Sequence, residues 1–108
     1  MAYFRAFGGS GGAQGYSVSL STYTSNTQIT CPFKWTKVQA IYRRSSDSVL
    51  MAATYTKGDA TQNYYQGTTM NAVAIGASGW NSIISDAQDN YITINGNTKD
   101  MVVAFIKE

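Results

Sequence analysis

Few side chains in this sequence could carry out catalysis or bind a metal. The chain has no histidine, one cysteine and six carboxylates among its 108 residues. Without histidine, the commonest general base is missing, and neither a Ser-His-Asp nor a Cys-His arrangement can form. The single cysteine, Cys31, excludes an internal disulfide and a zinc site built on several cysteines. We therefore predict a protein that is not an enzyme and needs no cofactor and no metal ion.

The carboxylates closest together in the sequence are Asp86 and Asp89, which Asn90 follows. Their oxygen atoms are of the kind that binds Ca²⁺, but their spacing does not match the twelve-residue calcium loop. Aspartate and asparagine also favour turns, because their side chains hydrogen-bond to nearby backbone. We expect a solvated turn here rather than a cation site.

Aromatic and amide side chains are the best candidates for binding a ligand. Flat rings suit the apolar face of a sugar, and amides or carboxylates suit its hydroxyls, in a concave site. Residues 57–67 are predicted to form a long loop bounded by glycines, and loops of that length are usually functional. Tryptophan and tyrosine also serve as core or interface residues in small domains, which remains the alternative. The candidate ligand-binding residues are Trp35, Asp59, Asn63, Tyr64, Tyr65, Gln66 and Trp80.

A second possible ligand is single-stranded nucleic acid. Trp35, Lys37, Gln39 and Arg43 fall on one parity of an expected strand, where aromatic stacking and positive charge could share a sheet face. The alternative is a sheet face on which lysine and arginine stems cover the tryptophan. We favour the latter because the net charge is only +2.

The elements that must position these residues are predicted to be strands. Tyr16, Val18 and Leu20 alternate with serines, which indicates a half-buried strand. About eight short strands with turn signals at close spacing indicate an all-β, antiparallel β-sandwich of jelly-roll-like type. The expected strands are 16–21, 29–33, 37–43, 49–56, 72–75, 82–85, 91–94 and 101–106. Strands 37–43 and 49–56 are predicted to pair as a hairpin, and Cys31 to be a core residue.

The end of the chain is predicted to form a second hairpin, in which strands 91–94 and 101–106 flank a connection carrying Asn95-Gly96. The last strand is apolar on both faces, so both require cover, and another subunit could supply part of it. Val102, Ala104 and Ile106 are therefore candidate interface residues.

Residues 1–15 are predicted to be an aromatic and glycine-rich arm that precedes a sandwich domain at 16–108. Tyr3, Phe4 and Phe7 are candidate interface residues, either at the tip of a mobile linker or docked on a neighbouring subunit. No secretory signal is recognised, and the longest apolar run, 101–106, is too short to span a bilayer. We therefore expect synthesis in the host cytoplasm and no membrane partner.

The surface is predicted to be polar but weakly charged. Charged residues make up 13% of the chain, against about 25% in typical domains. Serine, threonine, asparagine and glutamine supply one third of it, 36 of 108 residues. Such a surface suits hydrogen bonding to sugars or neighbouring subunits and lacks the field that duplex DNA requires.

The glycine-rich lead at 8–15, the strands rich in serine, threonine and asparagine, and the terminal segment from 91 to 106 resemble small virion-associated domains of bacteriophages. The likeness is to the head domains of tail-fibre, head-fibre or receptor-binding proteins. It implies a β-sandwich, commonly trimeric, that associates with itself and other virion proteins and contacts cell-surface glycan. The leading hypothesis is thus a structural or adhesive virion protein. The alternatives are a small single-stranded nucleic-acid-binding β-barrel or an inhibitor of a host protein.

Overall fold

The computed structural model describes residues 14–23, 26–76, 83–95 and 98–108, and all regular elements within these ranges are β-strands. The predicted all-β fold is therefore confirmed. In chain order the strands are β1 (Gln14–Tyr23), β2 (Thr27–Thr30), β3 (Lys37–Arg44), β4 (Leu50–Thr56), β5 (Thr61–Gln66), β6 (Thr69–Ala74), β7 (Ile84–Gln88), β8 (Tyr91–Ile94) and β9 (Thr98–Lys107).

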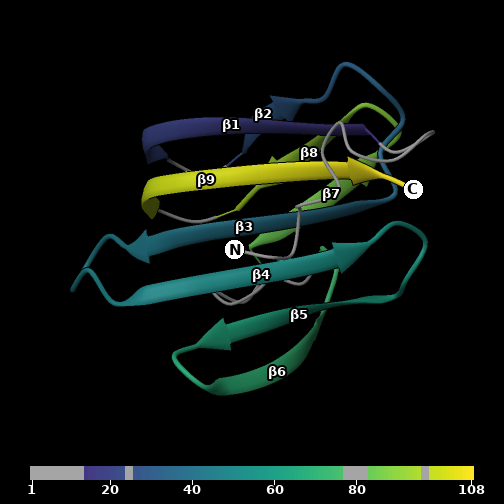
Figure 1. Ribbon diagram of the computed structural model, residues 1–108. Helices are drawn as coiled ribbons and strands as arrows, with labels where there is room; N and C mark the ends of the chain where they lie inside the picture. Colours follow the sequence, from purple (N-terminus) through teal and green to yellow (C-terminus); the bar gives the residue numbers. More distant parts are fainter. Residues whose placement is uncertain (1–13, 24–25, 77–82, 96–97) are drawn as a thin grey trace.

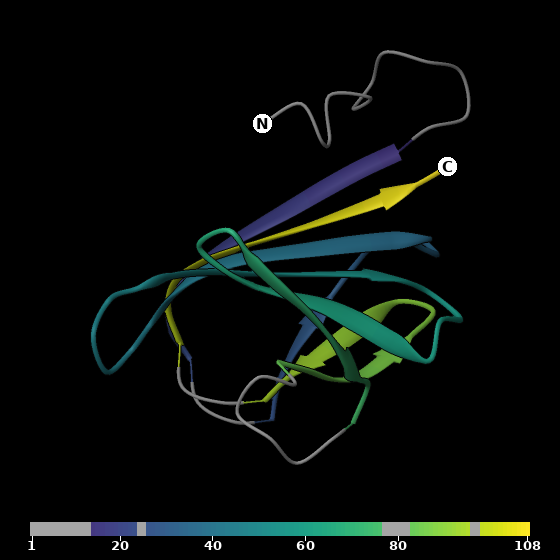
Figure 2. The same ribbon diagram turned by 90° about the horizontal axis from the view of Figure 1, so that it is seen from below.

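The strands form two antiparallel sheets. The larger has six strands in the order β1-β9-β3-β4-β5-β6, and the smaller has three in the order β2-β8-β7. Figure 1 shows β1 and β6 at opposite margins of the larger sheet, and Figure 2 shows the smaller sheet covering part of one of its faces. The predicted antiparallel sandwich is confirmed, with nine described strands where the sequence indicated about eight.

The core lies between the two sheets. Alternation along each strand sends one set of side chains inward. The smaller sheet contributes Ile92 and Ile94, both fully buried. Burying one such side chain is worth about 1.5–3 kcal/mol. Cys31 is 1% exposed and Ile29 4%, which confirms that this cysteine is a core residue. The larger sheet contributes, among others, Val38, Ala40, Tyr42, Val103 and Phe105.

Residues 57–67 do not form the predicted loop. Only a short turn follows β4, and β5 and β6 then pair as a hairpin between Thr61↔Ala74 and Gln66↔Thr69. The β5 sequence TQNYYQ has the period of a strand, because Gln62 and Tyr64 are buried while Asn63 and Tyr65 are half-buried on the other face. The alternation is hard to recognise in the sequence because the buried residue Gln62 carries a polar amide.

The predicted hairpin of β3 and β4 is confirmed, since the two strands pair from Lys37↔Thr56 to Arg43↔Leu50. The predicted terminal hairpin is wrong. β8 pairs with β2 and β7 in the smaller sheet, and β9 lies between β1 and β3 in the larger one. The chain therefore passes from the smaller sheet to the larger one between β8 and β9. The predicted arm, 1–15, lies outside the described residues up to position 13, and β1 begins at Gln14.

Candidate functional site

The outer face of the larger sheet, which points away from the smaller sheet, carries rows of polar side chains across β3, β4 and β5. Residues directly opposite one another in an antiparallel pair project from the same face. Thr54 of β4 is opposite Gln39 of β3 on one side and Asn63 of β5 on the other. Lys37 is likewise flanked by Thr56 of β4 and Ile106 of β9. The regular register thus assembles side chains from four strands into one surface.

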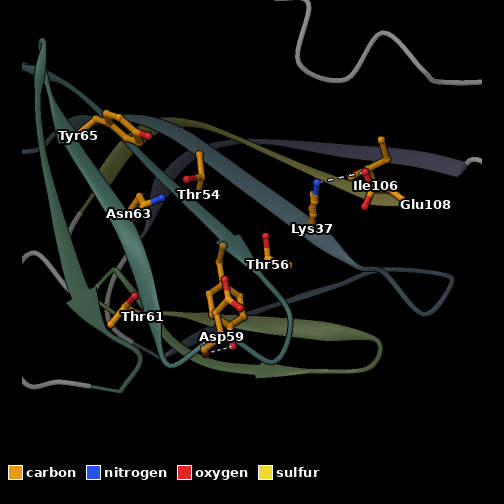
Figure 3. A pocket seen from close by; sticks show the side chains of 10 residues that line it. Lys37, Thr54, Thr56, Asp59, Thr61, Asn63, Tyr65, Ile106 and Glu108 are labelled. Carbon is orange, nitrogen blue, oxygen red and sulfur yellow. Dashed lines mark hydrogen bonds and ion pairs between the residues drawn. The ribbon is translucent and has the colours of Figure 1, made fainter.

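A groove of about 350 Å³ lies on this face. Figure 3 shows that Tyr65 stands at one end, Lys37, Ile106 and Glu108 at another, and Asp59 at the β4–β5 turn. Most of the lining is polar. The groove is lined by Lys37, Thr54, Tyr55, Thr56, Asp59, Thr61, Asn63, Tyr65, Ile106 and Glu108.

The β5 strand positions three of the lining residues. Thr61, Asn63 and Tyr65 alternate with side chains that enter the core, so all three point to the outer face. Tyr65 lies opposite Ala52 of β4, and its side chain lines one end of the groove. The tyrosine is therefore half-buried and held by a paired strand.

The turn between β4 and β5 positions Asp59. Gly58 has a φ of 98°, a left-handed conformation that favours glycine. The Asp59 backbone N–H donates to the Thr56 carbonyl at 3.0 Å, and the Tyr55 hydroxyl donates to the Asp59 carbonyl at 2.8 Å. Because its backbone is fixed on both sides, Asp59 presents its exposed carboxylate at the groove margin.

An ion pair closes the end of the groove near the chain terminus. Lys37 Nζ lies 3.2 Å from a carboxylate oxygen of Glu108, and both side chains are partly exposed. The Thr36 hydroxyl accepts from the Glu108 N–H at 3.1 Å and donates to the Ile106 carbonyl at 3.1 Å. These bonds fix the end of β9 against the start of β3.

Several polar groups in the groove are available to a ligand. Among the described residues, the side chains of Thr54, Asn63 and Tyr65 make no hydrogen bond, and neither do those of Thr56 and Thr61. Their hydroxyl and amide groups can both donate and accept. The groove therefore offers a set of neutral hydrogen-bonding groups beside one aromatic ring.

Three of the predicted ligand-binding residues, Asp59, Asn63 and Tyr65, meet in this groove. Gln66 is exposed at the end of β5 and does not line it, and Trp80 lies outside the described residues. Tyr64 was wrongly assigned to the site, because strand alternation turns it into the core, where it is 2% exposed. Burial raises the pKa of its hydroxyl above the usual value of 10.0.

Trp35 was also wrongly assigned, because it is fully buried. Its ring packs against Tyr55 at 6.2 Å and Phe105 at 5.8 Å between centroids. Lys57 Nζ lies 4.8 Å from the ring centroid. The tryptophan precedes β3 instead of belonging to it, so it does not share the outer face of Lys37. The aromatic and basic stripe considered for nucleic acid is therefore not formed around Trp35.

The sequence reasoning missed the threonines of the groove and Glu108. Thr54 and Thr56 alternate with buried residues of β4, and this period-two pattern was the signal that could have identified them. Glu108 carried no such signal, because it follows the end of β9 and reaches the groove only through strand register.

The candidate interface residues differ in exposure. Val102 is 43% exposed and Ala104 half-buried, whereas Ile106 is 7% exposed and is already covered within one copy. Tyr3, Phe4 and Phe7 lie outside the described residues.

The carboxylates of Asp86 and Asp89 interact with side chains of the protein itself. Asp89 pairs with Lys57 at 3.4 Å and Lys34 at 4.0 Å, and Asp86 accepts from the Gln88 amide at 2.8 Å. In the described ranges no three histidine, cysteine or carboxylate side chains gather in a way that could hold a metal ion.

Comparison with known proteins gives no assignment. No family model matches the chain, and no curated protein and no solved structure matches it significantly. In the part of the chain that the structure describes, no helix is long and apolar enough to cross a membrane.

Proposed function

We propose that this protein is a non-enzymatic adhesive domain that binds carbohydrate in the groove across β3, β4 and β5. The observation that carries the proposal is the combination of the groove-lining Tyr65 ring with the unpaired hydroxyl and amide groups of Thr54 and Asn63. A sugar presents an apolar face and several hydroxyls, and these are the two kinds of surface that the groove can satisfy together.

The charges of the groove narrow the class of sugar. Lys37 is paired with Glu108 at 3.2 Å, so the second carboxylate, Asp59, leaves an excess negative charge on the lining. Sulfated or carboxylated sugars would be repelled. The proposed ligand is therefore a neutral glycan.

A shallow groove of about 350 Å³ is at the small end of the sites that bind small molecules, so one copy would bind weakly. Several copies acting together would raise the strength of attachment by avidity. This supports the proposal that the chain self-associates, as the resemblance to virion-associated bacteriophage domains implies, and that it contacts cell-surface glycan and other virion proteins.

A glycan array followed by titration calorimetry tests the proposal. We expect neutral glycans to bind and Tyr65→Ala to weaken that binding at least about tenfold, which is the loss of roughly one aromatic contact. Asn63→Ala should weaken it as well. Tyr91→Ala is the matched control, because this half-buried tyrosine belongs to β8 in the other sheet and should leave affinity unchanged.

Two results would reject the carbohydrate site. One is an array on which no glycan binds the folded protein. The other is binding that is equally strong in wild type and Tyr65→Ala, with both variants folded by circular dichroism.

A further inference from the structure

The first strand leaves one side of its backbone unpaired within the described part of the chain. β1 spans ten residues and is hydrogen-bonded to β9 alone, so it forms one margin of the larger sheet (Figure 1). Its register with β9 is constant from Gln14↔Lys107 to Tyr23↔Thr98. The N–H and C=O groups that point away from β9 form a long, regular template for another strand.

Proteins usually protect such margins with short strands, charges, prolines or bulges. The smaller sheet follows this rule: β2 has four residues with Pro32 shortly after it, and β7 has five, carries Asp86 and shifts register beside it. The other margin of the larger sheet, β6, has six residues. β1 is the longest of these four strands, and its sequence, QGYSVSLSTY, contains neither a charge nor a proline.

The apolar side chains of β1 are incompletely covered, which favours pairing with a further strand. Tyr16, Val18 and Leu20 project on the side of the smaller sheet, yet Tyr16 is 39% exposed and the other two are only partly buried. Figure 2 shows that the start of β1 lies away from the smaller sheet, so cover is least at the end of the strand that carries Tyr16. On the opposite face, Ser17 and Ser19 are exposed. The strand thus combines an incompletely covered apolar face with a serine face.

We infer that two copies of the chain pair through their β1 strands, antiparallel about a twofold axis, and so join two six-stranded sheets into one continuous sheet. The occupant is a second copy because the strand is self-complementary. Reversed upon itself, its apolar residues meet apolar residues and its serines meet serines, and no opposite charge is required.

The alternation also fixes the register. A shift by one residue would place serines opposite apolar side chains. Centring the pair on Val18 sets Val18 opposite its counterpart, Tyr16 opposite Leu20 of the second copy, and Ser17 opposite Ser19 of the second copy. This register covers the exposed Tyr16 ring and overlaps most of both strands.

Such a dimer presents both outer faces on the same side, because the twofold axis stands perpendicular to the joined sheet. The two grooves would then face one target surface. This bivalent consequence rests on the proposed carbohydrate site, whereas the pairing of β1 strands does not.

Light scattering after size-exclusion chromatography tests the pairing without any glycan. We expect wild type to be a dimer at micromolar concentration and the double variant Ser17→Lys with Ser19→Lys to dissociate roughly tenfold or more readily, because two lysine pairs then oppose one another. Thr69→Lys with Asn71→Lys is the matched control, since it adds the same charge to exposed positions on β6. A wild-type monomer, a trimer, or a dimer that the β1 lysines leave intact would overturn the inference.

Cysteine cross-linking tests the register. Val18→Cys should form a disulfide between copies on mild oxidation, because its counterpart lies directly opposite at about 4.5–5.5 Å between Cα atoms. Leu20→Cys should not, because the two cysteines would be roughly 13 Å apart along the strands. Native Cys31 is buried and supplies little background. Cross-linking at position 20 but not at 18 would overturn the register.

The two proposals fail separately. If the pairing is right, the β1 lysine variant keeps the affinity of wild type for a soluble monovalent sugar and loses attachment to a glycan-coated surface. If only the carbohydrate site is wrong, no sugar binds and the dimer mass is unchanged.

Discussion

The side-chain amide of Gln62 is hydrogen-bonded in both directions to the backbone of Ile84. Gln62 Nε2 donates to the Ile84 carbonyl at 3.0 Å, and the Ile84 N–H donates to Gln62 Oε1 at 3.0 Å. Gln62 lies on β5 in the larger sheet and Ile84 begins β7 in the smaller one, and both are fully buried. The glutamine therefore acts as a short piece of strand that connects the two layers.

Replacing this glutamine should destabilise the fold strongly. Gln62→Ala leaves a buried N–H and a buried carbonyl of Ile84 without the partners they now have, and each such loss costs about 1–3 kcal/mol. We expect the free energy of unfolding in urea to fall by roughly 2–5 kcal/mol. Gln66→Ala, an exposed change on the same strand, should alter it by about 0.5 kcal/mol or less. Equal effects of the two substitutions would contradict the role given to Gln62.

Substitutions of the two neighbouring tyrosines of β5 should differ in their effect on stability, because one side chain lies in the core and the other in the groove. Tyr64 is 2% exposed and its hydroxyl contacts Met51 Sδ at 3.9 Å, so Tyr64→Ala should cost about 3–5 kcal/mol, as for other large aromatic side chains in a core. Tyr65→Ala, on the groove side, should cost about 1 kcal/mol or less. Urea unfolding of both variants checks this. A larger loss in Tyr65→Ala would show that the assignment of their faces is reversed.

Alternation, although incomplete, made part of the fold predictable. Residues 37–43 and 49–56 each place a row of apolar side chains on the core face, although Ile41 and Leu50 lie on the outer one. The polar residues between the two segments supply a turn, so the β3–β4 hairpin followed from local chemistry. The strand β5 was missed because Gln62, its fully buried residue, is polar. Its burial depends on backbone groups of Ile84, more than twenty positions later in the sequence.

The predicted terminal hairpin, which the structure does not form, shows a second limit of prediction from sequence. Asn95-Gly96 favours a tight turn, but turn chemistry does not determine which sheet each flanking strand joins. For the groove, Asp59, Asn63 and Tyr65 were identified from residue type alone. Tyr64 and Trp35 could not be excluded, because assigning the face of a side chain requires first knowing the strand to which it belongs.

The turn between β3 and β4 should make stability depend on acid pH. Arg44 donates two hydrogen bonds to the Asp47 carboxylate, at 2.8 and 2.7 Å. These bonds hold the pKa of Asp47 below its usual value of 3.8. A carboxyl whose pKa is lowered by folding stabilises the protein above its unfolded pKa, and the contribution disappears as pH falls through the folded pKa.

We therefore expect wild type to melt at a slightly higher temperature than Asp47→Asn at neutral pH, and the difference to vanish well below pH 3.8. Thermal melts recorded across pH check this. A difference between wild type and Asp47→Asn that grows towards acid pH would contradict the assignment.

The buried cysteine should react slowly. Cys31 is 1% exposed, and burial raises the pKa of its thiol above the usual value of 9.0. Because the thiolate is the nucleophile, both effects protect it. If reaction with a thiol reagent requires global unfolding, it should be about a thousandfold or more slower in the native protein than in denaturant. Ser45→Cys, in the exposed turn after β3, should react at once in the same folded protein and serves as the control. If Cys31 reacted as fast as the cysteine of Ser45→Cys, its thiol would lie at the surface. A dimer that a reducing agent dissociates would show that the thiol takes part in assembly.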